Sequence, residues 1–393
     1  VLLTERMVQP MDKPTVQDIF HRFYPAYLDQ YSPSPVQANV AHNIMNCKTG
    51  AYGANVCVCE DCGFVQIHYN SCRNRCCPMC QAVPKEMWMD ARREDVLDAP
   101  YFHLVFTVPD ILNPVIYSNQ RLLYDALYHA ASSTISELTA DPKHLGAKVG
   151  YICILHTWGS EMNFHPHIHT ILLGGGLASN NQWKDNGENF FLPIRVISKM
   201  FRGKYLEELK RLWEEDKLVF HGTAEKFRNH YTFKELLDSC YGMDWIPHCK
   251  KTFNGAQTVI KYLGKYTHRI AVSNHRIVRM DDDTVTFLVK DYRNEGQWKE
   301  LTISGVEFVR RFLMHVPPRR FVRIRHYGLL CSRTKSQKLT LCRNLLGCKK
   351  YLSKLRDMEM PEILEHLYGI KVCVCKACGG HLGKPQMRMP LRC

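Results

Sequence analysis

The stretch that decides the fold is FHPHIHTILLGGGL, residues 164–177. Its apolar run predicts a β-strand over 167–175, and three histidines alternate at its start: His165, His167 and His169. Because the side chains of a strand alternate between its two faces, these imidazoles project to one face. Two or three imidazoles can converge there on one divalent cation, although histidines exposed on a surface are the simpler alternative. The strand therefore predicts a metal site carried by a sheet.

The segments around this strand predict an α+β domain. YFHLVFTVP (101–109) and VGYICILHTW (149–158) have the composition of strands, and about 119–139 has the apolar spacing of a helix. Strand, helix, strand, strand and a later helix is the order of a ferredoxin-like fold, an antiparallel sheet with helices on one face. Further strands are predicted at 188–196 and 284–290, and a further helix at 197–216.

A second candidate element lies in QTVIKYLGKYTHR, residues 257–269. Tyr262 and Tyr266 are four residues apart in a predicted helix, so their side chains lie on one face. Taken alone, such a pair indicates core packing. Beside a cation held by histidines, however, a tyrosine hydroxyl can attack phosphorus to form a covalent 5′-phosphotyrosine and free a 3′-OH. Two tyrosines permit two such events, one that cuts and one that captures the second strand end.

Eight of the 18 cysteines lie between Cys47 and Cys80. Since no secretory signal points to an oxidising compartment, clustered thiols are more typical of metal ligands than of disulfides. Two Cys-x-x-Cys motifs with 14 residues between them predict one tetrahedral zinc site, formed by Cys59, Cys62, Cys77 and Cys80. Four other thiols are the number that a second zinc site needs: Cys47, Cys57, Cys72 and Cys76. In the alternative interpretation, Cys57 and Cys76 are spare thiols of a one-zinc module.

A sparser group of cysteines lies near the end of the chain. Cys375-x-x-Cys378, followed by two glycines, has the pattern of half a zinc knuckle. The thiols considered for its other half are Cys331, Cys342, Cys348 and Cys393.

Most of the positive charge is concentrated in one segment. The chain has a formal net charge of +14, and residues 299–356 carry 15 Lys and Arg against Glu300 and Glu307 alone. RRFVRIRHY (319–327) predicts a strand on which Phe321, Arg323, Arg325 and Tyr327 share one face. Arginines interleaved with aromatic residues suit the backbone and the unstacked bases of a nucleic acid. The candidate DNA-binding residues are Arg310, Arg311, Arg319, Arg320, Arg323, Arg325 and Tyr327. A solvated basic surface is the simpler alternative.

The sequence resembles the HUH two-tyrosine rolling-circle transposases of the insertion-sequence-91 type. The resemblance runs from about Asp18 to Gly380 and is carried by five segments: SCRNRCCPMCQ (71–81), YFHLVFTVP (101–109), HTWGSEMNFHPHIHTILLGGGL (156–177), YLGKYTHRIAVSNHR (262–276) and EFVRRFLMHVPPRRFVRIRHYG (307–328). Family members often have histidines where this chain has Asn55 and Cys76. Cys76 can replace an imidazole directly, and Cys57 is the candidate to replace the other.

The resemblance implies metal-dependent cleavage of single-stranded DNA at the ends of a mobile element, and movement by a rolling-circle-like route. It implies Mg²⁺ or Mn²⁺ on the histidine pair His167 and His169, with Tyr262 and Tyr266 as nucleophiles. His165 is a candidate third ligand, for which a carboxylate or amide from elsewhere is the alternative. Two rival interpretations are a zinc-dependent DNA-binding protein that no longer cuts, and a histidine-metal hydrolase of another phosphoester.

The expected organisation has four parts. They are an N-terminal helical segment (1–46), a zinc-binding module with a linking helix (47–98), the HUH catalytic domain (99–298) and a basic DNA-binding region with a knuckle-like end (299–393). No run of 18 apolar residues and no secretory signal occurs, so neither a membrane span nor export is expected and the expected location is the cytoplasm.

Overall fold

The computed structural model describes residues 13–185, 192–245, 247–253, 258–259, 262, 264, 271–291, 295–384 and 386–388. Tyr266 and Cys393, which the sequence singled out, lie outside these ranges. No helix within the described ranges is both long and apolar enough to cross a membrane.

The largest sheet is built around the strand that carries the histidines. Its strands pair antiparallel in the order β11–β4–β5–β3–β7, and β6 pairs with β5. The bounds are β3 Tyr101–Thr107, β4 Lys148–Trp158, β5 Phe164–Leu177, β6 Trp183–Asp185, β7 His248–Phe253 and β11 Ile324–Gly328. The three strands predicted at 101–109, 149–158 and 167–175 are confirmed, and they are neighbours in one sheet.

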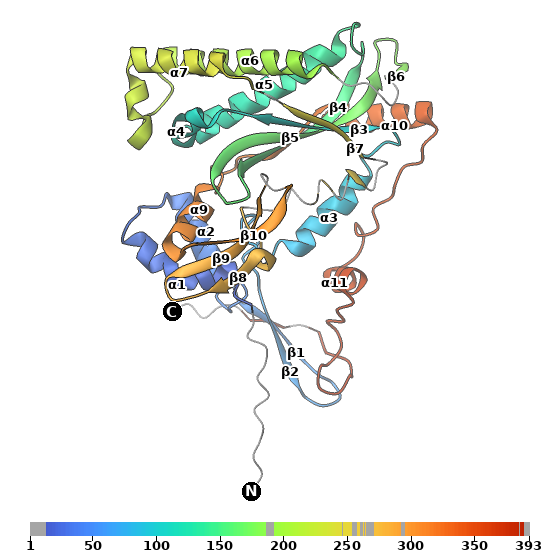
Figure 1. Ribbon diagram of the computed structural model, residues 1–393. Helices are drawn as coiled ribbons and strands as arrows, with labels where there is room; N and C mark the ends of the chain where they lie inside the picture. The colour runs from blue at the N-terminus through green and yellow to red at the C-terminus, as the bar shows by residue number, and fades with distance from the viewer. Residues whose placement is uncertain are drawn as a thin grey trace.

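Helices cover one face of this sheet, which is the upper face in Figure 1. They are α4 Asn113–Ser118, α5 Gln120–Ala140, α6 Ile194–Glu214 and α7 His230–Gly242, with the short 3-10 helices η1 Asp110–Leu112 and η2 Gly222–Arg228. Leu104, Cys153 and Ile168 are buried in the core that the sheet shares with these helices. Since strand side chains alternate, the neighbouring histidines face away from that core. The predicted α+β class is confirmed.

Three further elements were predicted after the histidine strand, and the structure confirms two of them. Residues 194–196 form the first turn of α6, so that part of the strand predicted at 188–196 is wrong, and 188–191 lie outside the described residues. The helix predicted at 197–216 is confirmed with an earlier start. The strand predicted at 284–290 is confirmed as β9 (Thr284–Asp291), but it belongs to a separate sheet of order β10–β9–β8.

That separate sheet packs with the first two helices of the chain into a second core. The elements are α1 Val16–Leu28, α2 Pro35–Met45, η3 Asn274–Arg276, β8 Ile277–Met280, β10 Gln297–Ser304 and α9 Gly305–Met314. Capping boxes at Thr15 and Ser34 begin α1 and α2, and Phe20 of α1 packs edge-on against Phe312 of α9 at 5.2 Å. The boundary expected at 298/299 falls inside β10, which pairs with β9 over its whole length, so the structure has no division there.

The rest of the chain forms a hairpin and a long C-terminal connection. The elements are β1 Ala54–Val58, β2 Val65–Tyr69, α3 Ala82–Arg93, α10 Lys335–Leu346, α11 Met360–Tyr368 and β12 Gln386–Arg388. In Figure 1 the chain descends from α10 past α11 to the β1–β2 hairpin, where β12 pairs with β1. Asp90 of α3 anchors this descent, because its carboxylate accepts hydrogen bonds from Tyr351, Ser353 and Leu355.

Candidate functional site

Three buried imidazoles meet on the face of the large sheet opposite helices α4–α7. His167 and His169 come from β5, and His156 comes from β4, where it pairs directly with His167. The Nε2 atoms of His167 and His169 lie 3.1 Å apart, and one nitrogen from each of the three rings lies within 4.8 Å of the others. This arrangement can hold one divalent cation.

The protonation state of these rings suits metal binding. Burial lowers the pKa of His167 to about 4 and holds the pKa of His169 well below its usual range, so both rings are neutral at pH 7. His167 Nδ1–H donates to the carbonyl oxygen of His165 at 2.7 Å, which leaves the Nε2 lone pair of His167 directed at the cluster. The sheet therefore presents imidazoles in the form that ligates a cation.

His165 does not join this group, so the third imidazole differs from the predicted one. The His165 side chain is one third exposed, and its Nδ1 lies 3.3 Å from a carboxylate oxygen of Asp110. The β4–β5 register is interrupted after the pair His156 and His167, so His165 lies beyond the regular part of the ladder. Sequence reasoning missed His156, although it lies in the predicted strand 149–158 and strand pairing was the signal that could have found it.

Tyr262 lies beside the three imidazoles. Its hydroxyl is 2.6 Å from His103 Nε2 and 3.4 Å from His169 Nδ1, and His103 Nε2 is itself 2.9 Å from His169 Nδ1. The Tyr262 ring is half-buried against the apolar cluster on this face of the sheet. His103, a residue of β3 that the sequence did not single out, thus connects the tyrosine to the histidine cluster. Tyr266 lies outside the described residues.

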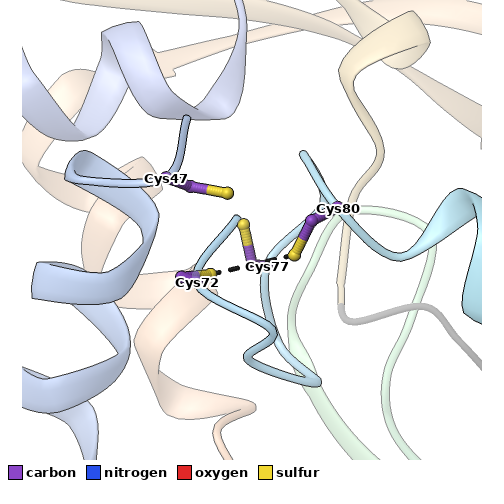
Figure 2. Close-up of side chains that lie close together, drawn as sticks. All are labelled: Cys47, Cys72, Cys77 and Cys80. Atoms are coloured by element: carbon purple, nitrogen blue, oxygen red, sulfur yellow. Dashed lines mark hydrogen bonds between the residues drawn. The ribbon is translucent and has the colours of Figure 1, made fainter. Parts of the chain in front are cut away.

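The first cysteine cluster combines Cys47, Cys72, Cys77 and Cys80, as Figure 2 shows. Cys47 follows α2, and the other three lie in the loop before α3. Cys72 and Cys80 have their sulfur atoms 3.8 Å apart, and Cys47 and Cys77 are fully buried in the second core. The prediction that Cys77 and Cys80 share an ion with Cys59 and Cys62 is therefore wrong.

The second cluster joins Cys59 and Cys62 of the hairpin to Cys375 and Cys378 of the C-terminal segment. Cys57 and Cys76 belong to neither cluster: Cys57 is buried beside Leu382, and Cys76 lies next to Arg75 and Arg323. The second zinc group predicted from Cys47, Cys57, Cys72 and Cys76 is thus only half correct. Among the thiols considered as partners of Cys375, three lie away from it (Cys331, Cys342 and Cys348), and Cys393 is outside the described residues.

Five of the seven candidate DNA-binding residues have partners within the protein. β11 begins only at Ile324, so the strand predicted over 319–327 is wrong for its first half. Arg323 is half-buried next to Cys76. Arg325 pairs with Asp125 and lies 4.0 Å from the centre of the Tyr128 ring, and Tyr327 stacks on Tyr151. Glu307 holds both Arg310 and Arg311 in ion pairs, and they lower its pKa to about 2. The prediction that these five side chains form an open DNA-binding surface is therefore not supported.

Arg319 and Arg320 differ, because both are exposed in the turn before β11. They line a groove of about 290 Å³ together with Arg75, at the junction of α2 and the first cysteine cluster. Arg75 donates to the backbone carbonyl oxygens of Phe321 and Pro318, which fixes this turn against the cysteine loop. Arg75 thus holds in place the backbone that carries the two exposed guanidinium groups.

Sequence relatives and family models show that the chain is a transposase, and it belongs to the insertion-sequence-91 type. Residues 19–108 match the model of the transposase zinc-binding domain, and residues 150–338 match that of a putative transposase family. The chain is 40% identical to putative transposase y4qJ of Sinorhizobium fredii over 93% of both chains. It is 30% identical to the transposase for insertion sequence element IS801 of Pseudomonas savastanoi pv. phaseolicola, over 77% of this chain and 72% of that protein.

One solved structure also aligns with part of the chain. It is the conjugative relaxase TrwC in complex with oriT DNA, in its metal-bound form, with 13% identity and a TM-score of 0.24 over 42% of this chain and 70% of that chain. At this score the alignment carries no argument about the site. The sequence relatives and the cysteine clusters show a transposase with a zinc-binding domain.

Proposed function

We propose that this transposase nicks single-stranded DNA at insertion-sequence ends through a tyrosine nucleophile and moves the element by a rolling-circle-like route. The observation that carries the proposal is the position of the Tyr262 hydroxyl, 2.6 Å from His103 Nε2 and 3.4 Å from His169 Nδ1. A tyrosine whose role is only packing has no need of a hydroxyl held against a cluster of buried imidazoles. Tyr266 is proposed as the second nucleophile from the sequence resemblance alone.

His156, His167 and His169 would hold the catalytic cation. Their nitrogens lie within 4.8 Å of one another, and a set of three imidazoles fits Mn²⁺ better than Mg²⁺, which prefers oxygen ligands. When bound, such a cation polarises a phosphate oxygen and offsets the charge that develops at phosphorus. Because β4 and β5 fix all three rings, the site exists before DNA arrives.

In the cleavage step, the Tyr262 oxygen forms a bond to phosphorus and the bond from phosphorus to the 3′-oxygen breaks. The phenol gives up its proton, and the departing 3′-oxygen leaves as a hydroxyl after taking one up. The product is a 5′-phosphotyrosine, which conserves the phosphodiester energy for strand transfer. His103 orients the hydroxyl through its contact with Tyr262, and His169 Nδ1 lies close to both the hydroxyl (3.4 Å) and His103 Nε2 (2.9 Å).

Arg319 and Arg320 are proposed to contact DNA phosphates. They are the exposed members of the predicted arginine set, and the groove beside them is lined by α2 and by Asn74, Arg75 and Cys76 of the loop before α3. We also assign the structural zinc of the zinc-binding domain to Cys47, Cys72, Cys77 and Cys80, because four thiolates within reach of one point match a closed tetrahedral site.

The test uses labelled single-stranded DNA that contains an element end, incubated with the protein and Mn²⁺ or Mg²⁺. The wild type should form a covalent adduct that resists SDS, and Tyr262→Phe and Tyr266→Phe should each retain part of it. The double variant and His167→Ala should form none. Tyr231→Phe is the matched control, since Tyr231 is exposed on α7 and far from the site.

Two outcomes would contradict the proposal. An adduct that forms equally well in the Tyr262→Phe/Tyr266→Phe double variant would remove the tyrosine mechanism. Tight binding of the DNA without any adduct, with either cation, would favour the rival function of a zinc-dependent DNA-binding protein that no longer cuts.

A further inference from the structure

We infer that Cys59, Cys62, Cys375 and Cys378 form a second zinc site, which ties the C-terminal segment to the hairpin near the start of the chain. One thiolate from each motif faces one from the other: Cys59 Sγ lies 3.5 Å from Cys378 Sγ, and Cys62 Sγ lies 3.8 Å from Cys375 Sγ. With Zn–S bonds of about 2.3 Å, the sulfur atoms of a tetrahedral site lie about 3.8 Å apart. These separations fit such a site and are far too long for disulfides, whose S–S length is about 2.05 Å.

The two motifs have the same backbone geometry. In the hairpin, Cys59 N–H donates to Phe64 O and Gly63 N–H donates to Cys59 O. In the C-terminal segment, Cys375 N–H donates to Gly380 O and Gly379 N–H donates to Cys375 O. The glycine four residues after the first cysteine is left-handed in both turns, with φ +70° at Gly63 and φ +80° at Gly379. Two equivalent knuckles that face each other make up a complete four-thiolate site.

Backbone amides donate hydrogen bonds to both sulfur atoms of the C-terminal knuckle. Ala377 N–H donates to Cys375 Sγ and Gly380 N–H donates to Cys378 Sγ, both at 3.4 Å. Hydrogen bonds from amides stabilise the charged form of sulfur, which is the form that binds a metal.

Apolar packing cannot hold this region without help. The only buried cluster found here among the described residues consists of Cys57, Cys59, Cys375 and Leu382. Large apolar side chains of the hairpin are about half exposed, including Phe64, Val65, Ile67 and Tyr69. A three-stranded sheet of this size usually needs a metal or a disulfide to stay folded, so the ion supplies the stability that the core lacks.

The geometry around the knuckles shows what the ion would connect. Cys62 and Cys375 are 313 residues apart in sequence, and the C-terminal segment pairs with β1 through β12 and through the bridge between Cys59 and Leu382. The zinc-binding domain matched by family comparison ends at residue 108, so half of this site lies outside it. The hairpin is therefore complete only when the C-terminal segment has returned to it.

The first experiment counts zinc per full-length chain by mass spectrometry of the metal. The background is His167→Ala/His169→Ala, which removes the imidazole site as a source of zinc. The Cys59→Ser/Cys62→Ser and Cys375→Ser/Cys378→Ser variants should each lose one ion, and the quadruple variant should lose no more than one. Cys57→Ser/Cys373→Ser is the matched control and should keep both ions. If Cys375→Ser/Cys378→Ser keeps as much zinc as the control, the shared site is wrong.

The second experiment needs no variant, so misfolding cannot confuse it. Cys62, Cys373 and Cys378 are all exposed, yet only Cys373 lies outside the cluster. In the zinc-loaded protein, N-ethylmaleimide should label Cys373 but spare Cys62 and Cys378, and a chelator should release both thiols together. Labelling of Cys378 in the zinc-loaded protein, at the rate seen for Cys373, would overturn the inference. Neither experiment involves DNA, so both are independent of the proposed cleavage.

Discussion

The histidine site and the cysteine clusters are two proposed metal-binding regions that the fold supports in opposite ways. The three imidazoles project from paired strands β4 and β5, whose backbone hydrogen bonds hold them in place without any ion. The cysteines lie in loops and turns, where no regular ladder of backbone hydrogen bonds fixes the four thiols of a cluster against one another. A structural zinc site is closed by four protein ligands, whereas a catalytic site keeps a position open for substrate. The histidine site should therefore tolerate metal removal, and the cysteine clusters should not.

The largest effect that tests this comparison is expected for Cys77→Ser. Cys77 is fully buried in the second core, and loss of its thiolate should release the zinc of the first cluster and lower the free energy of unfolding by about 4 kcal/mol or more. His167→Ala should change it by only about 1–2 kcal/mol, because the sheet supports itself. Urea unfolding of both variants measures the difference.

The matched control is Cys240→Ser, which alters a fully buried thiol in the large core that belongs to neither cluster. It should cost about 1–2 kcal/mol, the penalty for burying a hydroxyl. If Cys77→Ser is no more destabilising than Cys240→Ser, the first cluster does not depend on an ion.

The next effect concerns which imidazole completes the histidine site. His156→Ala should weaken Mn²⁺ binding at least about tenfold, because it removes one of three ligands. His165→Ala should change the affinity for Mn²⁺ less than about twofold, since the His165 side chain contacts Asp110 and not the histidine cluster. Isothermal titration of both variants with Mn²⁺ decides between them, and the reverse order of effects would restore His165 as the ligand.

These two regions also show how far the sequence could predict the structure. The period-two pattern located the strand of His167 and His169 and the face that they share, because that pattern is local. The position of His156 depends on how β4 pairs with β5, and no local pattern encodes that register. The Cys-x-x-Cys spacing likewise predicted each knuckle but not its partner. The sequence predicted that the knuckle of Cys59 and Cys62 shares an ion with the next knuckle along the chain. The fold instead places Cys375 beside Cys62.

The arginines were mispredicted for a related reason. Alternation in RRFVRIRHY correctly grouped Arg325 and Tyr327 on one face, but the face turned out to pack against Tyr128 and Tyr151 rather than face solvent. Charge pattern alone does not reveal whether a cation has an internal partner. Here Asp125, which lies 200 residues earlier, supplies one.

A smaller effect is expected for His315, at the end of α9, which contacts the end of β4. His315 Nε2–H donates to Met162 O at 3.0 Å, and its Nδ1 lies 3.2 Å from Thr157 Oγ1 at the end of β4. Burial lowers the pKa of His315 to about 4 in the folded protein, below the value of about 6.5 expected when unfolded. Between these values the unfolded chain binds more protons, so stability is full above pH 6.5 and falls as the pH drops toward 4.

The predicted loss for this group is about 1–2 kcal/mol between pH 7 and pH 5. His315→Gln should reduce the pH dependence of the free energy of unfolding, measured with urea, by that amount. The contribution of the other buried histidines to this pH dependence should not change. If His315→Gln has the same pH dependence of the free energy of unfolding as the wild type, protonation of His315 does not cause the loss of stability.

The smallest effect separates arginines on the turn from those on the strand. Arg319→Gln/Arg320→Gln should weaken binding of a single-stranded oligonucleotide about threefold to tenfold. It should also reduce the slope of log K against log salt by about 1.4, since each of the two lost phosphate contacts contributes about 0.7 in single strands. Arg325→Gln should leave that slope unchanged and instead lower the free energy of unfolding by about 1–2 kcal/mol, because it loses its contacts with Asp125 and Tyr128 of α5. A reduced salt slope in Arg325→Gln, with normal stability, would mean that the strand and not the turn carries the DNA contacts.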